Sequence, residues 1–275
     1  MPPDEKDERA AAALESWRPA PLDHGAIREA AALEEYRRLL LPLGDAPSTP
    51  PTWVLQGFLS PGLTILVGPP RSYKSLLALH MIAAVTEGVP IDQLHPPPQR
   101  RGSAIYFPAE QSPHTLRYIY ETRVLGHKLP EDVGRRWDFA VARDPWDWKI
   151  DEPTLSHNLL SLIEDLKPTL IILDPFIHFH SQDENDPHVV SYLVPLKKAV
   201  RAYQGSLLLI HHVRKGQAGS RNEGIPDWER VRGTSALFAM ADGGIQLKRL
   251  ASGGVNIQTD FKDFPGSTWT WNIKK

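Results

Sequence analysis

The sequence of 275 residues contains no cysteine, only three methionines and no long apolar run. The absence of cysteine excludes disulfide bonds and thiolate zinc sites, and it fits a reducing cytosol. No apolar stretch approaches the length that spans a membrane, and the charged first residues do not resemble a signal peptide. We therefore expect a cytoplasmic protein without a membrane partner.

The sequence also lacks an excess of either charge, because its 31 Lys and Arg nearly balance its 33 Asp and Glu, for a net charge of -2. No overall basic field can attract nucleic acid, so any such binding must come from a local patch or loop. Hydrophobic residues make up 41% of the chain, enough for one large core. These values favour one globular domain with an appendage.

The most informative segment is Leu63 to Ser75, which reads L-T-I-L-V-G-P-P-R-S-Y-K-S. An apolar strand leads into a turn at Gly68, and Lys74 and Ser75 open an apolar helix. This pattern predicts a phosphate-binding loop, in which backbone N–H groups and the lysine hold the β- and γ-phosphates of ATP and the serine hydroxyl holds Mg²⁺. The predicted nucleotide contacts are Gly68, Pro69, Pro70, Arg71, Ser72, Tyr73, Lys74, Ser75, Leu76 and Asp174.

One position departs from the usual loop pattern, G-x-x-x-x-G-K-[ST]. Tyr73 stands where the second glycine is expected. If this position needs a positive φ, a tyrosine is strained there. We expect the departure to change the rate of hydrolysis rather than to prevent binding.

The pattern of apolar segments predicts an α/β fold. Near-continuous apolar strands separated by helices indicate a mostly parallel sheet that is buried on both faces, and the last two strands predict a C-terminal β-hairpin at one sheet edge. The predicted strands are Leu63–Val67, Ser103–Phe107, Leu170–Leu173, Ser206–His211, Gly244–Leu247, Val255–Phe261 and Thr268–Ile273. Two predicted helices, Asp7–Trp17 and Gly25–Leu41, and a proline-rich linker form a short N-terminal helical arm (residues 1–53) before the main domain (residues 54–275).

Two acidic residues follow predicted strands. Glu110 follows Ser103–Phe107 and is placed to orient an attacking water, because ligands of open parallel sheets bind at the carboxyl ends of the strands. Asp174 follows Leu170–Leu173, and we expect it to hold Mg²⁺ with Ser75 from the strand next to the phosphate-binding loop. The alternative for each carboxylate is a cap on the following helix.

Two histidines, His211 and His212, end a further strand. A polar residue there can contact both the γ-phosphate and the loop that follows. Metal binding by the pair is the weaker alternative, because adjacent strand residues face opposite ways. A second histidine-rich group, between His178 and His188, has irregular spacing, and we interpret it as a polar loop.

The segment from Val213 to Arg232 is rich in glycine and basic residues, a composition that can follow a phosphate backbone, although an ordinary loop is the alternative. The predicted nucleic-acid contacts are Arg214, Lys215, Arg221 and Arg230. Lys248 and Arg249 end the next strand, where either could reach the γ-phosphate of a neighbouring subunit. Alternatively, both are edge-strand charges that oppose aggregation.

Five motifs in this order resemble the RecA-like P-loop ATPases, and among them the RepA-type hexameric replicative helicases of plasmids and phages. The motifs are V-G-P-P-R-S-Y-K-S, Y-F-P-A-E, L-I-I-L-D-P, L-I-H-H-V-R-K-G and R-G-T-S-A-L.

The resemblance covers residues 55–250, and it implies roles for individual residues. Lys74 and Ser75 would carry the nucleotide and Mg²⁺, Glu110 would be the catalytic base and His212 the γ-phosphate sensor. It also implies a homo-oligomeric ring, most often a hexamer, whose central channel grips single-stranded DNA. Arg232 and Arg249 are then both candidates for the arginine that completes a neighbour's ATP site, and Asp242 lies near where some relatives carry it.

The sequence thus predicts a ring-forming ATPase that moves on single-stranded DNA. A non-motor, ATP-dependent switch of a mobile element or regulatory system is the alternative, and Tyr73 favours it. A small-molecule kinase is the third possibility, but Glu110 and the histidines suit activation of water better.

Overall fold

A computed structural model describes residues 37–38, 40–46, 48, 52–91, 100–129, 138–183, 186, 188–212 and 235–273. The chain divides into two units, residues 1–50 and 51–275. In the first unit, Arg37 and Arg38 are helical and a 3-10 helix η1 spans Leu43–Asp45. The rest of the predicted N-terminal arm lies mostly outside the described residues. The predicted division into residues 1–53 and 54–275 stays a prediction.

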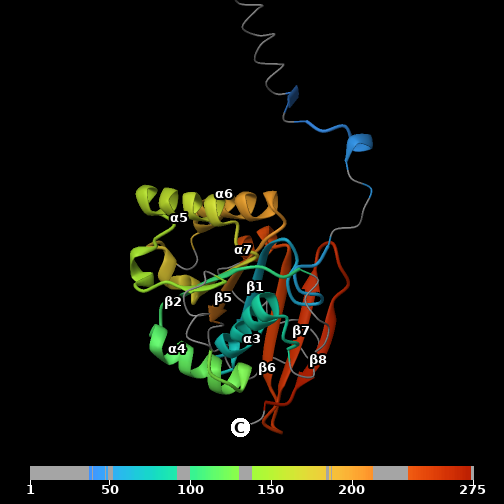
Figure 1. Ribbon diagram of the computed structural model, residues 1–275. Coiled ribbons are helices and arrows are strands. Elements are labelled where there is room, and N and C mark those ends of the chain that lie inside the picture. Colours follow the sequence, from blue (N-terminus) through green and yellow to red (C-terminus); the bar gives the residue numbers. More distant parts are fainter. Residues whose placement is uncertain are drawn as a thin grey trace, which may run out of the picture. The chain divides into compact units, whose positions relative to one another are not determined.

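The second unit is built on one eight-stranded sheet with the order β3-β2-β4-β5-β1-β6-β7-β8. Its first six strands are parallel, and β7 and β8 extend the sheet as antiparallel strands beside β6 (Figure 1). This arrangement confirms the predicted α/β fold and its C-terminal hairpin. The strands are β1 Gly62–Gly68, β2 Ala104–Pro108, β3 Phe139–Val141, β4 Leu170–Asp174, β5 Ser206–His212, β6 Gly243–Arg249, β7 Val255–Phe261 and β8 Ser267–Trp271.

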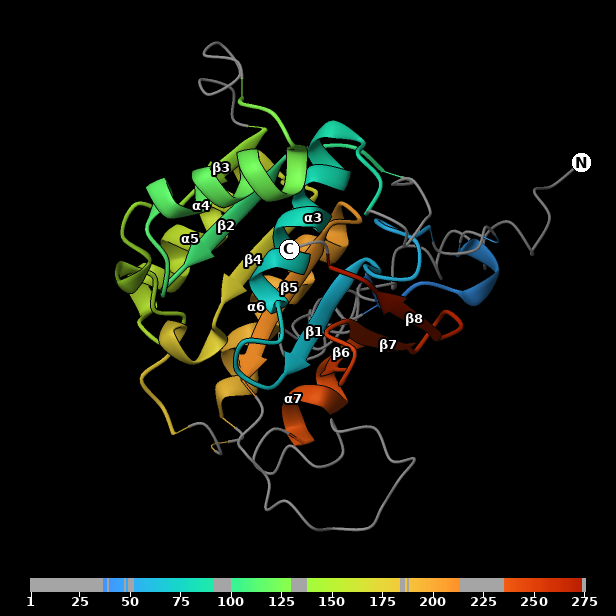
Figure 2. The same cartoon turned by 90° about the horizontal axis from the view of Figure 1, so that it is seen from below.

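The strand order corrects one expectation. Asp174 ends β4, which is not the strand next to the phosphate-binding loop, because β5 lies between β4 and β1. Ser206 at the start of β5 is in register with both Leu170 of β4 and Gly62 of β1. Figure 2 shows the carboxyl ends of β2, β4, β5 and β1 at the same edge of the sheet. The residues that follow these strands can therefore meet although their strands are not all neighbours.

Helices cover both faces of the sheet, with α3 and α4 on one face and α5 and α6 on the other (Figure 1). Alternate residues of each strand contribute to the two cores: Leu66 and Ile172 pack on the face of α3, whereas Ile65 and Ile171 pack on the face of α5 and α6. The continuous apolar runs of the strands follow from this double burial. The helices are α3 Lys74–Glu87, α4 Pro113–Ile119, η2 Tyr120–Leu125, η4 Pro145–Asp147, α5 Pro153–Leu166, η5 Phe176–Phe179, α6 Val189–Ala202 and α7 Ser235–Met240.

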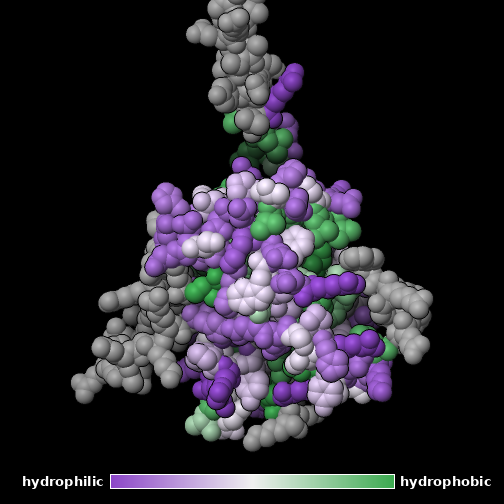
Figure 3. All heavy atoms as spheres, turned by 90° about the vertical axis from the view of Figure 1, so that its left-hand side faces the viewer, coloured by the Kyte–Doolittle hydropathy of each residue, from purple (hydrophilic) through white to green (hydrophobic). Residues whose placement is uncertain are grey.

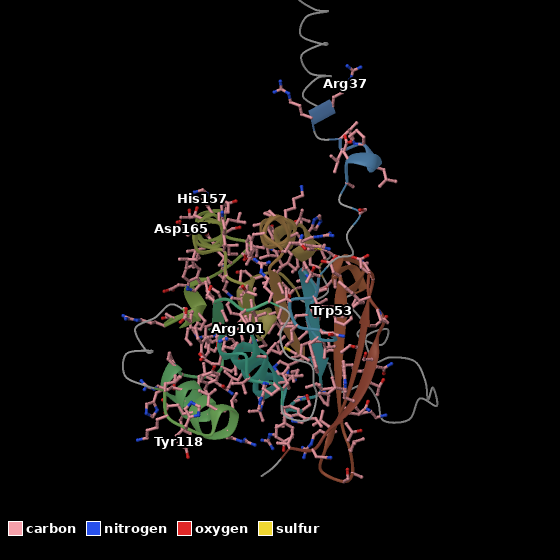
Figure 4. All side chains as sticks on the ribbon, turned by 45° about the vertical axis from the view of Figure 1, so that its right-hand side comes forward. Arg37, Trp53, Arg101, Tyr118, His157 and Asp165 are labelled. Atoms are coloured by element: carbon pink, nitrogen blue, oxygen red, sulfur yellow. The ribbon has the colours of Figure 1, made fainter. Side chains whose placement is uncertain are left out.

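The outer surfaces of the helices are mainly polar, although Leu166 of α5 and Val194 of α6 are also exposed. Tyr118 of α4 and His157 and Asp165 of α5 lie on the outside of the unit (Figure 4). The face of the molecule shown in Figure 3 is mainly hydrophilic, with hydrophobic spots that are small and separate. Within the described part of the chain, no helix is both long and apolar enough to cross a membrane.

The edge of the sheet is closed by aromatic packing. Trp53, which precedes β1, contacts the ring of Phe261 at the end of β7 at a centroid distance of 4.7 Å. The ring of Trp269 in β8 stacks on Phe58 at 4.7 Å. The segment before β1 therefore packs on β7 and β8, and residues of these antiparallel strands join the same core as residues of the parallel ones.

Candidate nucleotide-binding site

The turn after β1 is shaped by close packing at Gly68. A Cβ atom there would lie 2.6 Å from the Ser72 hydroxyl oxygen and 3.0 Å from the carbonyl oxygen of Leu247. Glycine is thus required because the turn packs directly against the end of β6. Pro69, Pro70 and Arg71 are exposed along the turn. The buried Ser72 hydroxyl has no hydrogen-bond partner among the described residues, as expected of a loop that binds a polar group.

Lys74 opens α3 and is buried, with 5% of its surface exposed. Its Nζ donates hydrogen bonds to the carbonyl oxygens of Gly68 at 2.9 Å and Pro69 at 3.0 Å, so the ammonium lies inside the turn. Burial lowers the pKa of Lys74 from 10.5 to about 8, and the carboxylates of Asp174 and Glu110 counteract part of this shift. A lysine that opens a helix inside such a turn is the arrangement typical of a phosphate-binding loop.

Ser75 and Asp174 lie together at the start of α3. The Ser75 hydroxyl donates a hydrogen bond of 2.7 Å to Asp174 Oδ2, and the Tyr106 hydroxyl of β2 donates to the same oxygen. Burial raises the pKa of Asp174 above its ordinary value, and the two hydrogen bonds oppose the shift. A serine hydroxyl beside a carboxylate is a hard oxygen donor set that fits Mg²⁺. Asp174 therefore has these two partners rather than the alternative role of a helix cap.

Tyr106 is a site residue that the sequence analysis did not identify. Burial raises the pKa of its phenol well above the ordinary value, so the hydroxyl remains a donor to Asp174. The available signal was a tyrosine in an otherwise apolar strand, because a buried tyrosine usually needs a hydrogen-bond partner. The identity of that partner was not visible, since 68 residues separate Tyr106 from Asp174.

Glu110 lies just beyond β2, and its carboxylate faces two histidines. Its Oε1 is 3.7 Å from Nε2 of His212 and 3.9 Å from Nε2 of His178. Burial lowers the pKa of His212, and the positive charge of Lys74 lowers it further, so the imidazole is neutral near pH 7. The helix that follows is capped by Ser112, which accepts a hydrogen bond from the backbone N–H of Thr115 at 3.2 Å, so Glu110 is not its cap.

His178 belongs to the histidine-rich segment that the sequence predicts to be a polar loop. It lies in η5, directly after β4, and its ring contacts the exposed Trp146 at a centroid distance of 4.5 Å. Among the residues that the structure describes, no group of three or more His, Cys, Asp or Glu side chains could hold a metal ion. His178 therefore joins the site through Glu110.

Tyr73 has a left-handed backbone, with φ 68° and ψ 24°, immediately before Lys74. The position that normally takes glycine therefore does require a positive φ in this chain, which costs a tyrosine of the order of 1–3 kcal/mol. The guanidinium carbon of Arg249, at the end of β6, lies 5.8 Å from the centre of the Tyr73 ring.

Arg214, Lys215, Arg221, Arg230 and Arg232 lie outside the described residues. Asp242 accepts a hydrogen bond of 2.8 Å from the backbone N–H of Leu63 and forms an ion pair of 2.8 Å with Lys197. It is buried at the start of β6, the end of the strand opposite to the site. Its role is therefore structural.

The pKa of Lys74 gives a pH prediction. Above pH 8 the lysine of the free protein loses its proton, and ATP binding must then restore it, so the affinity for ATP should fall by roughly tenfold for each pH unit above 8. Calorimetry between pH 7.5 and 9.5 measures the affinity and the proton uptake. Lys74→Arg is the control, because a guanidinium stays charged over this range. A wild-type affinity as independent of pH as that of Lys74→Arg would contradict the assignment.

The parallel sheet, the turn around Lys74 and the Ser75–Asp174 pair together define a P-loop ATPase. Residues 31–218, more than half of the chain, match the family described as AAA domain. The chain therefore belongs to the AAA domain family. No curated protein matches its sequence.

Proposed function

We propose that this ATPase forms a homo-oligomeric ring of six subunits. The ring would couple ATP hydrolysis to movement on single-stranded DNA, as a RepA-type helicase does. One observation carries the proposal. His212 lies 3.7 Å from Glu110 and is followed in the chain by the basic segment 213–232. A single side chain therefore connects the residue that activates water with the residues that we expect to hold DNA.

In the proposed reaction, Lys74 and the loop N–H groups hold the phosphates of ATP. Glu110 accepts a proton from water while the water oxygen bonds to the γ-phosphorus and the bond to the β–γ bridging oxygen breaks, which releases ADP and phosphate. Bound Mg²⁺, held by Ser75 and Asp174, would neutralise charge on the phosphates. The neutral imidazole of His212 can donate a hydrogen bond to the γ-phosphate and lose it when the phosphate departs.

Each ATP site of the proposed ring would be completed by an arginine of the neighbouring subunit. Arg232 and Arg249 are the two candidates. A loop that changes position when the γ-phosphate departs would move the bound strand relative to the ring.

The experiment that tests the proposal combines ATPase rates, with and without single-stranded DNA, with the native mass of the assembly. An oligomeric ring whose turnover rises on addition of DNA supports a motor. Slow turnover that DNA does not change would contradict it and favour the ATP-dependent switch, for which the strained Tyr73 is the supporting observation. Transfer of phosphate to a small molecule would instead indicate a kinase.

DNA binding is predicted to depend on the segment after β5. The double replacement of Arg214 and Lys215 by alanine should weaken binding of single-stranded DNA and lower its salt dependence by about 0.7 for each DNA phosphate that is no longer neutralised. Fluorescence anisotropy at several salt concentrations measures both quantities. ATP affinity without DNA should remain near that of the wild type, which serves as the control for folding. Unchanged DNA affinity and salt dependence would show that DNA is held elsewhere.

A further inference from the structure

The end of β6 lies directly against the phosphate-binding loop. β6 pairs in parallel with β1 (Figure 2), and the register of Val67 with Gln246 places Gly68 beside Leu247. The contact is close, since a Cβ on Gly68 would lie 3.1 Å from Leu247 Cβ and 3.0 Å from its carbonyl oxygen. Arg249 is two residues further along the same strand. The loop therefore cannot change its conformation independently of the end of β6.

Tyr73 is the residue of this loop whose backbone conformation is strained. Its backbone is held in a left-handed conformation that tyrosine disfavours. Its carbonyl oxygen accepts the hydrogen bond from the backbone N–H of Leu77 at 2.9 Å, and Lys74 follows it directly. A rotation of the Tyr73 backbone would therefore displace both the lysine and the first turn of α3.

The Tyr73 ring is fixed from two sides. It is half-buried and packs against the hydrophobic core of the α3 face, which includes Leu76 and Leu247. The exposed guanidinium of Arg249 lies 5.8 Å from the ring centre, within the distance at which a cation–π interaction is attractive. The two contacts hold the ring on the β6 side of the loop.

We propose that Arg249 is a positioning residue for the phosphate-binding loop of its own subunit: by its contact with the Tyr73 ring it stabilises the left-handed conformation that places Lys74 on the phosphates. The interaction compensates for a tyrosine at a glycine position. The proposal rests on the proposed binding of ATP by this loop. Arg249 then acts within its own chain, and Arg232 remains the candidate for the arginine that completes a neighbour's ATP site.

The test is a double-mutant cycle on nucleotide binding. Affinities for ATP and for inorganic tripolyphosphate are measured for the wild type, Arg249→Ala, Tyr73→Gly and the double variant. Arg249→Ala should lower the affinity for both ligands about two- to fivefold, the range for an exposed cation–π contact. The same change in the Tyr73→Gly background should have no effect, because glycine adopts the left-handed conformation without support.

Three control variants separate the contact from other effects. Tyr73→Phe keeps the ring face and should retain the dependence on Arg249. Arg249→Lys keeps the charge but lacks the planar guanidinium that stacks on the ring, so it should restore only part of the affinity. Lys248→Ala removes the same charge one residue away, and its effect, whatever its size, should be equal in the wild-type and Tyr73→Gly backgrounds.

Several results would overturn the proposal. An equal loss of affinity in both backgrounds would show that Arg249 acts on the ligand and not through Tyr73. A loss for ATP but not for tripolyphosphate would place Arg249 on the nucleoside, and a fall in the rate at saturation with unchanged affinity would indicate the neighbour's site. Absence of ATP binding by the wild type would overturn the proposed function as well. ATP binding that is abolished by Lys74→Ala but shows no coupling between Arg249 and Tyr73 would overturn this inference alone.

Discussion

Replacing Lys74 with alanine is expected to abolish ATP binding. Lys74 is buried inside the turn and donates hydrogen bonds to the carbonyl oxygens of Gly68 and Pro69 at 2.9 and 3.0 Å, whereas the other charged side chain of the turn, Arg71, is exposed. Loss of one partner of a buried, hydrogen-bonded charge pair costs about 2–5 kcal/mol or more, equivalent to roughly 30- to 5,000-fold in affinity. Calorimetric titration with ATP measures the change.

The effect of the same substitution on folding stability can also be predicted. Because burial lowers the pKa of Lys74, desolvation of its charge is a cost to the folded state, and alanine need not destabilise the protein. Thermal unfolding without nucleotide is therefore the control, and we expect a midpoint near that of the wild type. Equal ATP affinity of a folded Lys74→Ala protein and the wild type would refute the assignment of the loop.

Glu110→Gln is expected to keep ATP binding and to lose hydrolysis. The amide has nearly the shape of the carboxylate but cannot accept a proton from water, and general-base catalysis contributes about 10²- to 10⁴-fold. Glu110 is well placed for this role, because its carboxylate is exposed at the carboxyl edge of the sheet and contacts His212 and His178. Steady-state release of phosphate at saturating ATP measures the loss.

The matched control for this variant is Glu164→Gln, since Glu164 is exposed on α5, away from the carboxyl edge of the sheet. Its turnover should equal that of the wild type. If turnover of Glu110→Gln remains within about tenfold of the wild type, less than the lower limit for a general base, another group activates the water. His178 and His212 would then be the next side chains to replace.

The Glu110 carboxylate is also the point at which several segments of the chain meet. His178 follows β4 and His212 ends β5, and their Nε2 atoms lie 3.9 and 3.7 Å from the same carboxylate oxygen. Lys149 donates to the carbonyl oxygen of His178 at 2.6 Å and thereby connects η5 with the segment before α5. A change in the loop after either strand can therefore reach the Glu110 carboxylate through one imidazole.

Much of the fold could be predicted because the strands are buried on both faces. The run from Leu63 to Val67 and the run from Leu170 to Leu173 have no polar face, and this pattern alone indicates a central parallel sheet. Strand β3, Phe139–Val141, was missed because it has only three residues, all partly exposed. Such a short edge strand depends on its pairing with β2 rather than on a pattern of its own.

The phosphate-binding loop could be predicted from the spacing of Gly68, Lys74 and Ser75, because a strand, a tight turn and a helix N-terminus are contiguous in the chain. The order of residues along the chain also predicts that Glu110 and Asp174 follow strands. It did not determine the partners of those residues, because strand order is a property of the whole sheet. The insertion of β5 between β1 and β4 could not be predicted from adjacent residues.

Which distant side chains share one site depends on the packing of the whole domain. Tyr106 and Ser75 meet at Asp174, and two imidazoles meet at Glu110, because the parallel strands have their carboxyl ends at one edge and α3 begins at that edge. Arg249 reaches Tyr73 for the same reason, since pairing of β6 with β1 brings together residues 176 positions apart (249 minus 73). These contacts are set by packing and register, which no local pattern in the sequence specifies.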